Sequence, residues 1–166
     1  MAFISDEQYK LVTDSVPMVC VDVIPVRQRP HGWQIGIITR ATGAEVGKYA
    51  LLGGRVYHNE LLDDAIARHI KTGWNLSSYS LWPGNSIEHP FYIQQYLHDS
   101  AARLPLGFDP SKHSVAMTYL IELTGEPQPS NEARAFHWIT LAEIPLHAGY
   151  NQQVLMTAAF AVLTKA

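Results

Sequence analysis

The stretch from Leu51 to Trp74, LLGGRVYHNELLDDAIARHIKTGW, holds the residue types best suited to chemistry. Gly53 and Gly54 allow a backbone turn that side chains would block, so a backbone carbonyl or amide can approach a ligand closely. Arg55 follows at once, and a guanidinium in this place can hold a phosphate through paired hydrogen bonds. The stretch therefore predicts a turn that cradles an anion.

Three charged residues continue this pattern at a regular spacing. Glu60, Asp64 and Arg68 are four residues apart, which predicts that they share one helix face and support one another. Glu60 has a second interpretation, as a residue favoured at a helix start by the helix dipole.

Hydrophobic patterns predict the elements that must position these residues. Apolar side chains at helical spacing in LLDDAIARHIKT predict a helix, with Gly73 as its C-terminal stop. The runs MVCVDVIPV, WQIGIITR and KYALLGGRV predict three strands, the last of which runs into the glycine pair. Ser5 and Gln8 form a capping-box pattern for a short first helix that ends before Pro17.

The second half of the chain predicts further strands and a final helix. We expect strands around residues 91–97, in HSVAMTYLIEL and in ARAFHWITLAEI, a long loop in HDSAARLPLGFDPSK, and an apolar helix in NQQVLMTAAFAVLTKA. Because strands and helices are interleaved without regular alternation, we expect an α/β fold with a mixed β-sheet between helices. The length of 166 residues predicts a single domain over residues 1–166.

Composition limits the classes of partner. Hydrophobic residues make up 47% of the chain and charged residues 16%, which is typical of a compact globular protein. The net charge of -3 gives no electrostatic reason to expect a nucleic-acid partner. No run approaches the roughly 18 apolar residues of a membrane span, and MAFISDEQYK lacks the apolar core of a signal peptide. We therefore expect a soluble cytoplasmic protein without a membrane partner.

The pattern Gly54-x5-Glu60-x7-Arg68 resembles the first half of the Nudix hydrolase signature, and Thr72-Gly73 resembles its end. The flanking segments DEQYKLVTDSVPMVCVDVIPV and ARAFHWITLAEI are similar to the GDP-mannose mannosyl hydrolase branch of that superfamily, which acts on nucleotide sugars. The resemblance implies a Nudix-like α/β/α sandwich. It also implies a small nucleotide-type ligand, a nucleoside diphosphate linked to another group such as a sugar.

The chain departs from this signature after Arg68. The family continues with Glu-x-x-Glu-Glu or a close variant, whose carboxylates hold Mg²⁺, whereas this chain has RHIKTG and is two residues shorter. Mg²⁺ requires oxygen ligands, and Lys71 adds a positive charge where carboxylates are expected. We therefore expect a degenerate Nudix box. Any dependence on Mg²⁺ should be weak or should use substitute ligands, namely Gly54 and Glu60 or Asp64.

The resemblance to the mannosyl hydrolase branch implies roles for one carboxylate and three arginines. Arg40 and Arg55 would neutralise the departing diphosphate, Arg68 would join them in binding substrate, and Asp22 would fix the linked group. The residue types alone leave alternatives open. Asp22 lies in an apolar strand and needs a partner if it is buried, so a structural ion pair with Arg40 or Arg55 is an equal alternative.

Two further roles follow from the same resemblance. His147, in the late loop PLHAGYNQQ, would activate water as a general base, since a neutral imidazole near pH 7 suits that task. Tyr119, in a later strand, would contact substrate. The alternative for His147 is an exposed loop histidine without a catalytic role.

Two other functions fit the same residues. One is a module that binds a nucleotide or small molecule without chemistry, and the other is an isomerase or biosynthetic enzyme on the same fold. The apolar C-terminal helix and the helical N-terminal arm predict a homodimer, as related Nudix proteins often pair.

Overall fold

The computed structural model describes residues 5–96 and 109–165. The predicted loop HDSAARLPLGFDPSK lies mostly outside this part of the chain. The described elements follow in the order α1 (Asp6–Ser15), β1 (Met18–Arg29), β2 (Gly32–Arg40), β3 (Tyr49–Ala50), β4 (Leu52–Arg55), α2 (Leu62–Trp74), β5 (Tyr79–Leu81), β6 (Tyr92–Tyr96), β7 (Ser114–Leu123), β8 (Ala133–Ile139), the 3-10 turns η1 (Leu141–Glu143) and η2 (Gly149–Asn151), and α3 (Gln153–Leu163).

The strands form one mixed sheet with the order β3-β2-β1-β7-β5, and β4, β6 and β8 pair with β1, β7 and β2. The long strand β1 lies at the centre, parallel to β7 and antiparallel to β2 and β4. Parallel and antiparallel pairs in one sheet confirm the predicted mixed topology.

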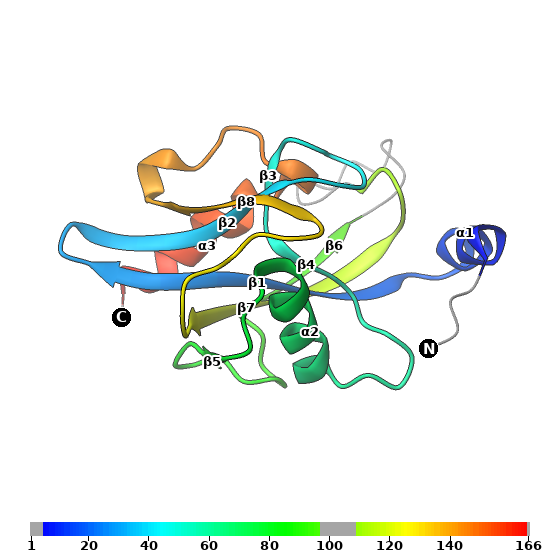
Figure 1. Ribbon diagram of the computed structural model, residues 1–166, viewed down its shortest axis with the longest axis horizontal. Coiled ribbons are helices and arrows are strands. Elements are labelled where there is room, and N and C mark those ends of the chain that lie inside the picture. The colour runs from blue at the N-terminus through cyan, green and yellow to red at the C-terminus, as the bar shows by residue number, and fades with distance from the viewer. Residues whose placement is uncertain (1–4, 97–108, 166) are drawn as a thin grey trace.

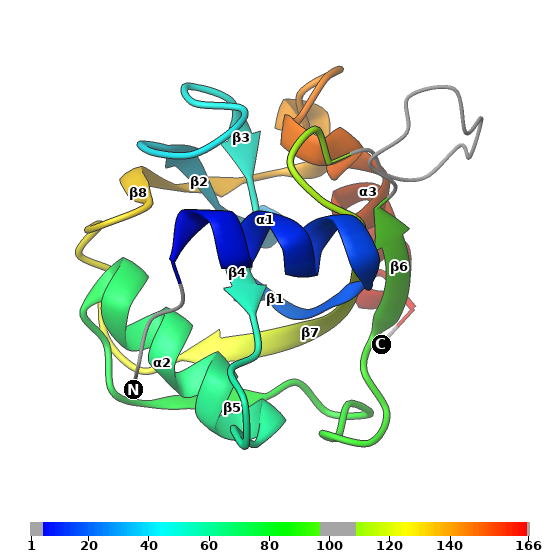
Figure 2. The same cartoon turned by 90° about the vertical axis from the view of Figure 1, so that its right-hand side faces the viewer.

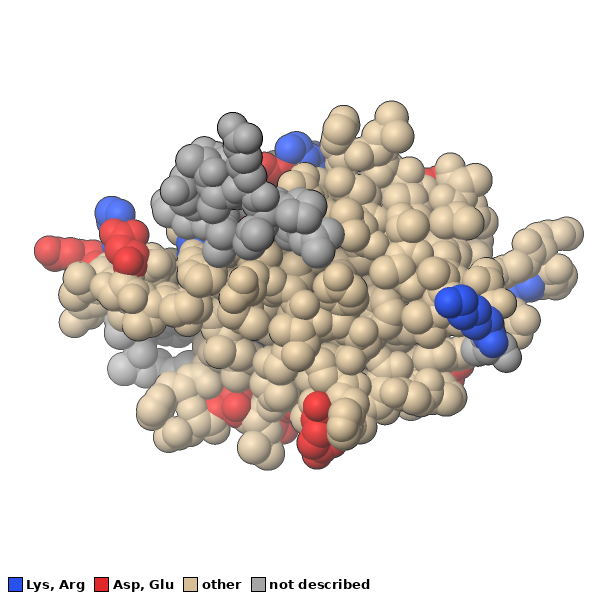
Figure 3. Space-filling view, turned by 180° about the vertical axis from the view of Figure 1, so that it is seen from behind, with Lys and Arg blue, Asp and Glu red and all other residues tan. Residues whose placement is uncertain are grey.

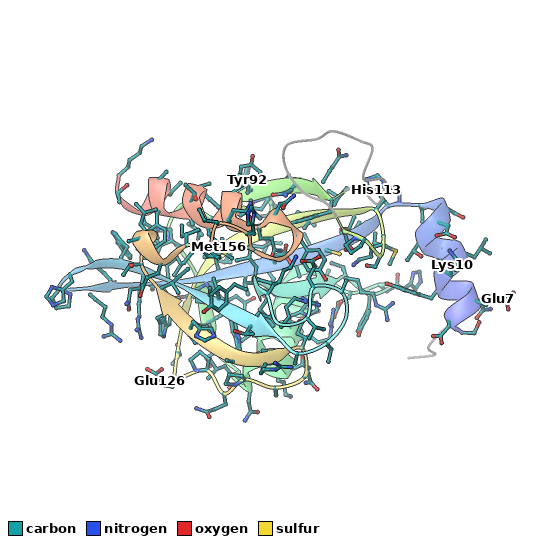
Figure 4. The ribbon with its side chains drawn as sticks, turned by 90° about the horizontal axis from the view of Figure 1, so that it is seen from above. Glu7, Lys10, Tyr92, His113, Glu126 and Met156 are labelled. Carbon is teal, nitrogen blue, oxygen red and sulfur yellow. The ribbon has the colours of Figure 1, made fainter. Side chains whose placement is uncertain are left out.

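Helices cover both faces of this sheet (Figures 1 and 2). Successive residues of a strand point to opposite faces, so β1 serves two cores. Val21 and Val23 pack in the cluster that contains α2, whereas Ile24 and Val26 pack in the cluster that contains α3. Figure 4 shows Met156, in the first turns of α3, lying over the sheet. The predicted α/β/α sandwich is therefore confirmed.

The end of α2 differs from the prediction. The helix passes through Gly73 to Trp74 and ends at Asn75, whose left-handed conformation (φ 55°) forms the C-terminal cap. Gly73 is buried, and a Cβ atom there would collide with the side chain of Leu52. The glycine therefore allows close packing of helix on sheet instead of stopping the helix. Glu60 precedes the helix, so the predicted shared helix face with Arg68 is wrong.

The predicted third strand is divided into β3 and β4. β3 pairs with β2 and β4 pairs with β1, so the chain changes its partner strand at Leu51. The amide of Leu51 donates instead to the side-chain carbonyl of Gln152, at 2.8 Å. A distant side chain thus completes the hydrogen bonding at this point, which no local pattern could reveal.

α1 lies at one end of the molecule, apart from the sheet (Figure 1). The predicted capping box is confirmed, because Ser5 accepts from the amide of Gln8 and Gln8 accepts from the amide of Ser5. None of the side chains of α1 is buried, and Leu11 is 68% exposed. Glu7 and Lys10 project from this helix in Figure 4.

Charged side chains are sparse on the face drawn in Figure 3 and are scattered over it without a continuous patch. None of the helices described in the structure has the length and apolar character required to cross a bilayer.

Candidate functional site

A cavity of about 160 Å³ opens on the side of the sheet that carries α3. Its lining joins residues from β1, β2, β4, β6 and β7 to residues from the segments that precede β7, β8 and α3. They are Cys20, Asp22, Arg40, Leu51, Gly53, Gly54, Tyr96, Asp109, Lys112, Ser114, Ala116, Glu132, Tyr150 and Gln152.

Asp22 is a buried carboxylate of this cavity. Strand alternation places it on the same face of β1 as Cys20 and Ile24, and its side chain is 7% exposed. Its one hydrogen bond within the described part of the chain is a long one, 3.4 Å from Nε2 of Gln152 to Oδ2. Burial, reinforced by the nearby charge of Glu132, raises the pKa of Asp22 to about 7. No ion pair with an arginine forms among the described residues, so the structural alternative for Asp22 is not realised.

The two glycines of the box admit close neighbours from the protein itself. Gly53 pairs with Asp22 across β4 and β1, and a Cβ atom on it would collide with the Asp22 carboxylate and the Val21 carbonyl. Gly54 faces α2, where a Cβ atom would lie 2.8 Å from Cε1 of His69. The predicted close approach to these two glycines therefore exists, but the groups that approach them are the side chains of Asp22 and His69.

Gln152 lines the cavity beside Asp22. Its Oε1 accepts from the amide of Leu51, which orients the side-chain amide so that Nε2 lies 3.4 Å from Asp22 and 3.3 Å from the hydroxyl of Tyr96. All these groups are buried. Sequence reasoning missed Gln152, although it lies in the late loop PLHAGYNQQ from which a catalytic base was expected.

The turn before α3 brings Gln152 into place through an unusual backbone. Tyr150 and Asn151 both have left-handed φ angles, 56° and 59°. Residues with a side chain avoid this region at a cost of roughly 1–2 kcal/mol, and such strain gathers at functional sites. Tyr150 is held there by a hydrogen bond to the Ala44 carbonyl, at 3.1 Å, and by the guanidinium of Arg40 at 5.2 Å from its ring.

Arg40 lies at the end of β2, where a register shift between Thr39 and Arg40 interrupts pairing with β8. Such a bulge redirects a side chain. The guanidinium donates to the carbonyls of Ala44 and Thr42, at 3.1 and 3.2 Å, and Nη1 lies 3.5 Å from Oε2 of Glu132. The structure thus brings Arg40 to the same cavity as Asp22, as the resemblance implied.

Glu132 is a second carboxylate of the cavity that sequence reasoning missed. It lies between Arg40 and His69, with 3.9 Å from its Oε1 to Nδ1 of His69, and burial raises its pKa. Burial, then the charge of Arg68, lowers the pKa of His69 to about 4. The imidazole is therefore neutral near pH 7, and we take its contact with Glu132 as a polar contact, not an ion pair. Glu132 lies immediately before the predicted strand ARAFHWITLAEI, in a segment without a recognisable motif.

Two further polar groups and a thiol complete the lining. Lys112 pairs with Asp109, with 2.8 Å between Nζ and Oδ2. Burial, then the charge of Asp22, raises the pKa of Cys20 to about 12, so the buried thiol is protonated.

The box residues Glu60 and Arg68 are bound to each other. Nε and Nη2 of Arg68 donate to the two carboxylate oxygens of Glu60, at 2.6 and 2.8 Å, and the amide of Tyr57 donates to the same carboxylate at 2.8 Å. The hydrogen bonds from Arg68 lower the pKa of Glu60 despite partial burial. Arg68 also donates to the carbonyl of Arg55, at 2.9 Å. This pair closes the loop after β4 onto α2.

The remaining predicted residues lie outside the cavity lining. The guanidinium of Arg55 lies 5.0 Å from the ring of Tyr9 in α1. His147 is exposed on the loop before α3. Tyr119 is fully buried, and its register partner is Val23, so strand alternation places it on the α2 face. Its hydroxyl donates to the carbonyl of Ile87, at 3.0 Å.

The donor set does not fit the Mg²⁺ ion that related proteins hold with carboxylates. Both oxygens of Glu60 are engaged by Arg68, and the helix positions that follow carry His69 and Lys71. Within residues 5–96 and 109–165, no three His, Cys, Asp or Glu side chains gather in a way that could hold a metal ion. Mg²⁺ requires several oxygen ligands in near-octahedral geometry, which these residues do not supply.

Comparison with solved structures finds the same fold in Nudix proteins. A possible asymmetric diadenosine tetraphosphate hydrolase from Jonesia denitrificans is 28% identical, with 90% of this chain and 96% of that chain covered and a TM-score of 0.74. A MutT Nudix hydrolase from Burkholderia pseudomallei is 22% identical over 88% and 98%, with a TM-score of 0.63. The Nudix domain of NrtR from Shewanella oneidensis, complexed with ADP-ribose, is 16% identical over 96% and 99%, with a TM-score of 0.57.

No curated protein matches the chain. A family model does, the domain of unknown function DUF4916, which covers residues 1–165. The chain therefore belongs to the DUF4916 family, and its fold is that of the Nudix superfamily.

Proposed function

We propose that this protein is a Nudix-type hydrolase for a nucleoside diphosphate linked to another group, with a sugar as that group. The observation that carries the proposal is the cavity lined by both Asp22 and Arg40: Asp22 is a buried carboxylate that forms no ion pair among the described residues, and the charge of Arg40 acts on it. The names of the neighbours, which concern diadenosine tetraphosphate and ADP-ribose, support a ligand in which phosphates join a nucleoside to a second group.

The cavity offers a group for each part of such a ligand. Arg40 meets the charge of the diphosphate, because a guanidinium in a site of low dielectric stabilises developing phosphate charge strongly. Gln152 and Tyr96 offer an amide and a hydroxyl to the hydroxyl groups of a sugar. Asp22, with its pKa raised to about 7, is suited to accept a proton near neutral pH.

In the proposed hydrolysis, a water oxygen attacks the sugar carbon that bears the diphosphate, and the water proton passes to Asp22. The C–O bond to the nucleoside diphosphate breaks, the hydroxyl stays on the sugar, and Arg40 neutralises the negative charge that the leaving diphosphate oxygen gains. Asp22 thereby takes the role of base for which we first considered His147. Arg68 joins the loop after β4 to α2, and the Arg55 side chain lies near the ring of Tyr9, outside the cavity lining.

A non-catalytic binding protein is the second candidate. The observation that favours it is the box itself, in which His69 and Lys71 occupy the region of the metal-binding carboxylates. This candidate predicts binding of the same ligands without products.

The test is an assay of the purified protein against GDP-mannose, other nucleoside diphosphate sugars, ADP-ribose and diadenosine tetraphosphate, with Mg²⁺ and with EDTA. Products are separated by chromatography, and binding is measured by calorimetry. Turnover that Asp22→Asn and Arg40→Met abolish supports the hydrolase, whereas binding without turnover supports the second candidate. His147→Gln and Arg55→Ala, assayed in parallel, test the roles first implied for those residues. Neither binding nor turnover with any compound would overturn both candidates.

We propose further that residues 1–166 act as one domain and that two copies pair through α1. The support is the apolar surface of α1 and its C-cap: Leu11 and Val12 in the helix and Val16 at the cap are exposed, and no side chain of α1 is buried.

A further inference from the structure

Lys112 is a cation of the cavity to which neither the Nudix box nor the proposed hydrolysis assigns a role. It lies in the segment before β7, its side chain is 21% exposed, and its Nζ is 2.8 Å from Oδ2 of Asp109. The Asp109 carboxylate is itself anchored, because it accepts from the amide and the hydroxyl of Ser111, at 2.8 and 2.5 Å. Asp109 thus holds the ammonium group at one place in the cavity wall.

The ammonium group has capacity for a ligand. It carries three N–H donors, and within residues 5–96 and 109–165 only Asp109 accepts one of them. Its charge lowers the pKa of Asp22 and of Glu132, so the ammonium lies within electrostatic reach of these two cavity carboxylates as well as of Asp109. Burial favours the neutral amine, but the hydrogen bond to Asp109 and the charge of that carboxylate together outweigh burial. They raise the pKa of Lys112, so the cation persists at neutral pH.

A diphosphate presents several negatively charged oxygens, so more than one cation can contact it at the same time. The box carboxylates that would hold Mg²⁺ in related proteins are replaced here, and Glu60 is bound to Arg68. Arg40 reaches the cavity from β2 and Lys112 reaches it from the segment before β7, so the two cations arrive from different elements. Both are tied to carboxylates that fix their positions, and both keep donors for a ligand.

We propose that Lys112, positioned by Asp109, forms with Arg40 a metal-independent subsite for the diphosphate of the ligand. The inference rests on the proposed function and deepens it, because it names the groups that supply positive charge without a bound divalent ion. Lys112 binds through charge-assisted hydrogen bonds, whereas Asp109 acts only through Lys112 and is a positioning residue.

The probe is inorganic pyrophosphate, titrated by calorimetry into the full chain in buffer with EDTA. Loss of a charge-assisted hydrogen bond corresponds to roughly a 10- to 100-fold weaker affinity, and we expect this loss in Lys112→Met. Lys112→Arg keeps the charge and should recover most of the affinity, and Asp109→Asn should give an intermediate loss. Lys71→Met removes the same charge from an exposed position on α2 and should leave the affinity within about twofold.

Thermal unfolding shows whether each variant is folded. If Lys112→Met does not fold, the pyrophosphate affinities of Lys112→Arg and Asp109→Asn are compared instead, and equal affinities of these two variants would overturn the positioning role of Asp109. Equal affinities of Lys112→Met and Lys71→Met would overturn the role of Lys112. Pyrophosphate binding that disappears in EDTA would overturn the metal-independent subsite. If Lys112→Met binds and turns over the nucleotide panel like the wild type, this inference fails and the proposed function stands. If the wild type binds neither pyrophosphate nor any nucleotide, both fail.

Discussion

Replacement of Asp22 by asparagine should stabilise the protein at pH 8. The carboxylate is buried, and its single long hydrogen bond comes from a neutral amide, so its ionised form is costly in the folded state. Burial raises its pKa from 3.8 to about 7. Each unit of pKa shift corresponds to about 1.4 kcal/mol, so the ionised carboxylate destabilises the fold by at most about 4 kcal/mol.

The sign of the pH dependence follows from proton binding. Between pH 3.8 and about 7 the folded protein holds a proton on Asp22 that the unfolded chain has lost. The free energy of unfolding of the wild type therefore falls as pH rises through this window. An asparagine side chain does not titrate, so the advantage of Asp22→Asn should be near zero at pH 4 and should approach its full value at pH 8.

The assay is urea-induced unfolding of both proteins at several values between pH 4 and pH 8.5. A gain of about 4 kcal/mol corresponds to roughly a 10 °C rise in Tm for a chain of this size. Glu132 is present in both proteins, so the difference between them reports Asp22 together with its electrostatic coupling to Glu132. Asp64→Asn, which removes a carboxylate exposed on α2, serves as the control and should show no such gain.

One result would refute this reasoning. If Asp22→Asn matches or falls below the wild type at pH 8, with the same slope of stability against pH, then Asp22 is neither desolvated nor unpaired. If the variant is more stable but binds ligand as well as the wild type, the cavity carboxylate is not part of the site. Stability gained together with loss of turnover would identify Asp22 as a group kept for function.

Three further predictions concern the fold and assembly. Gly53→Ala should lower the free energy of unfolding, measured in urea, by about 1–3 kcal/mol and should weaken ligand binding, because the new methyl group collides with the Asp22 carboxylate. Unchanged stability and binding would contradict the close packing of β4 on Asp22. Glu60→Gln should destabilise the fold by roughly 1–3 kcal/mol, because it disrupts the two hydrogen bonds between Arg68 and the Glu60 carboxylate. It should leave any turnover that remains in EDTA unaffected. A loss of turnover without a loss of stability would show that Glu60 acts in the reaction. Leu11→Glu should shift the mass measured by light scattering from that of a dimer to that of a monomer, because it places a charge on the exposed apolar surface of α1. A monomeric wild type would refute pairing through this helix.

Much of the local structure could be predicted because its causes are local. The capping box of α1 needs only Ser5 and Gln8, three residues apart, and the strands β1, β2 and β7 follow from apolar runs of the right length. Errors arose where a distant contact overrode a local rule. Gly73 serves packing against Leu52 and does not end the helix, and β3 and β4 separate where Gln152 bonds to Leu51.

The candidate site was predicted only in part, because a cavity is assembled from residues far apart in the chain. Asp22 and Arg40 were identified through their place in the resemblance. Gln152 lies 130 residues from Asp22, and Glu132 and Lys112 stand in segments without any motif, so their shared cavity depends on how the sheet and α3 pack.

By itself, the sequence determined the class of fold and the type of box, because hydrophobic period, glycine positions and the spacing of Glu60 and Arg68 are properties of the chain. The tertiary structure alone decided which side chains meet. A shift of one residue along a strand reverses the face of the sheet, and for this reason Asp22 faces the cavity whereas Tyr119, in register with Val23, faces the opposite core. The partners of Asp22, and the carboxylate that holds Lys112, follow from that packing.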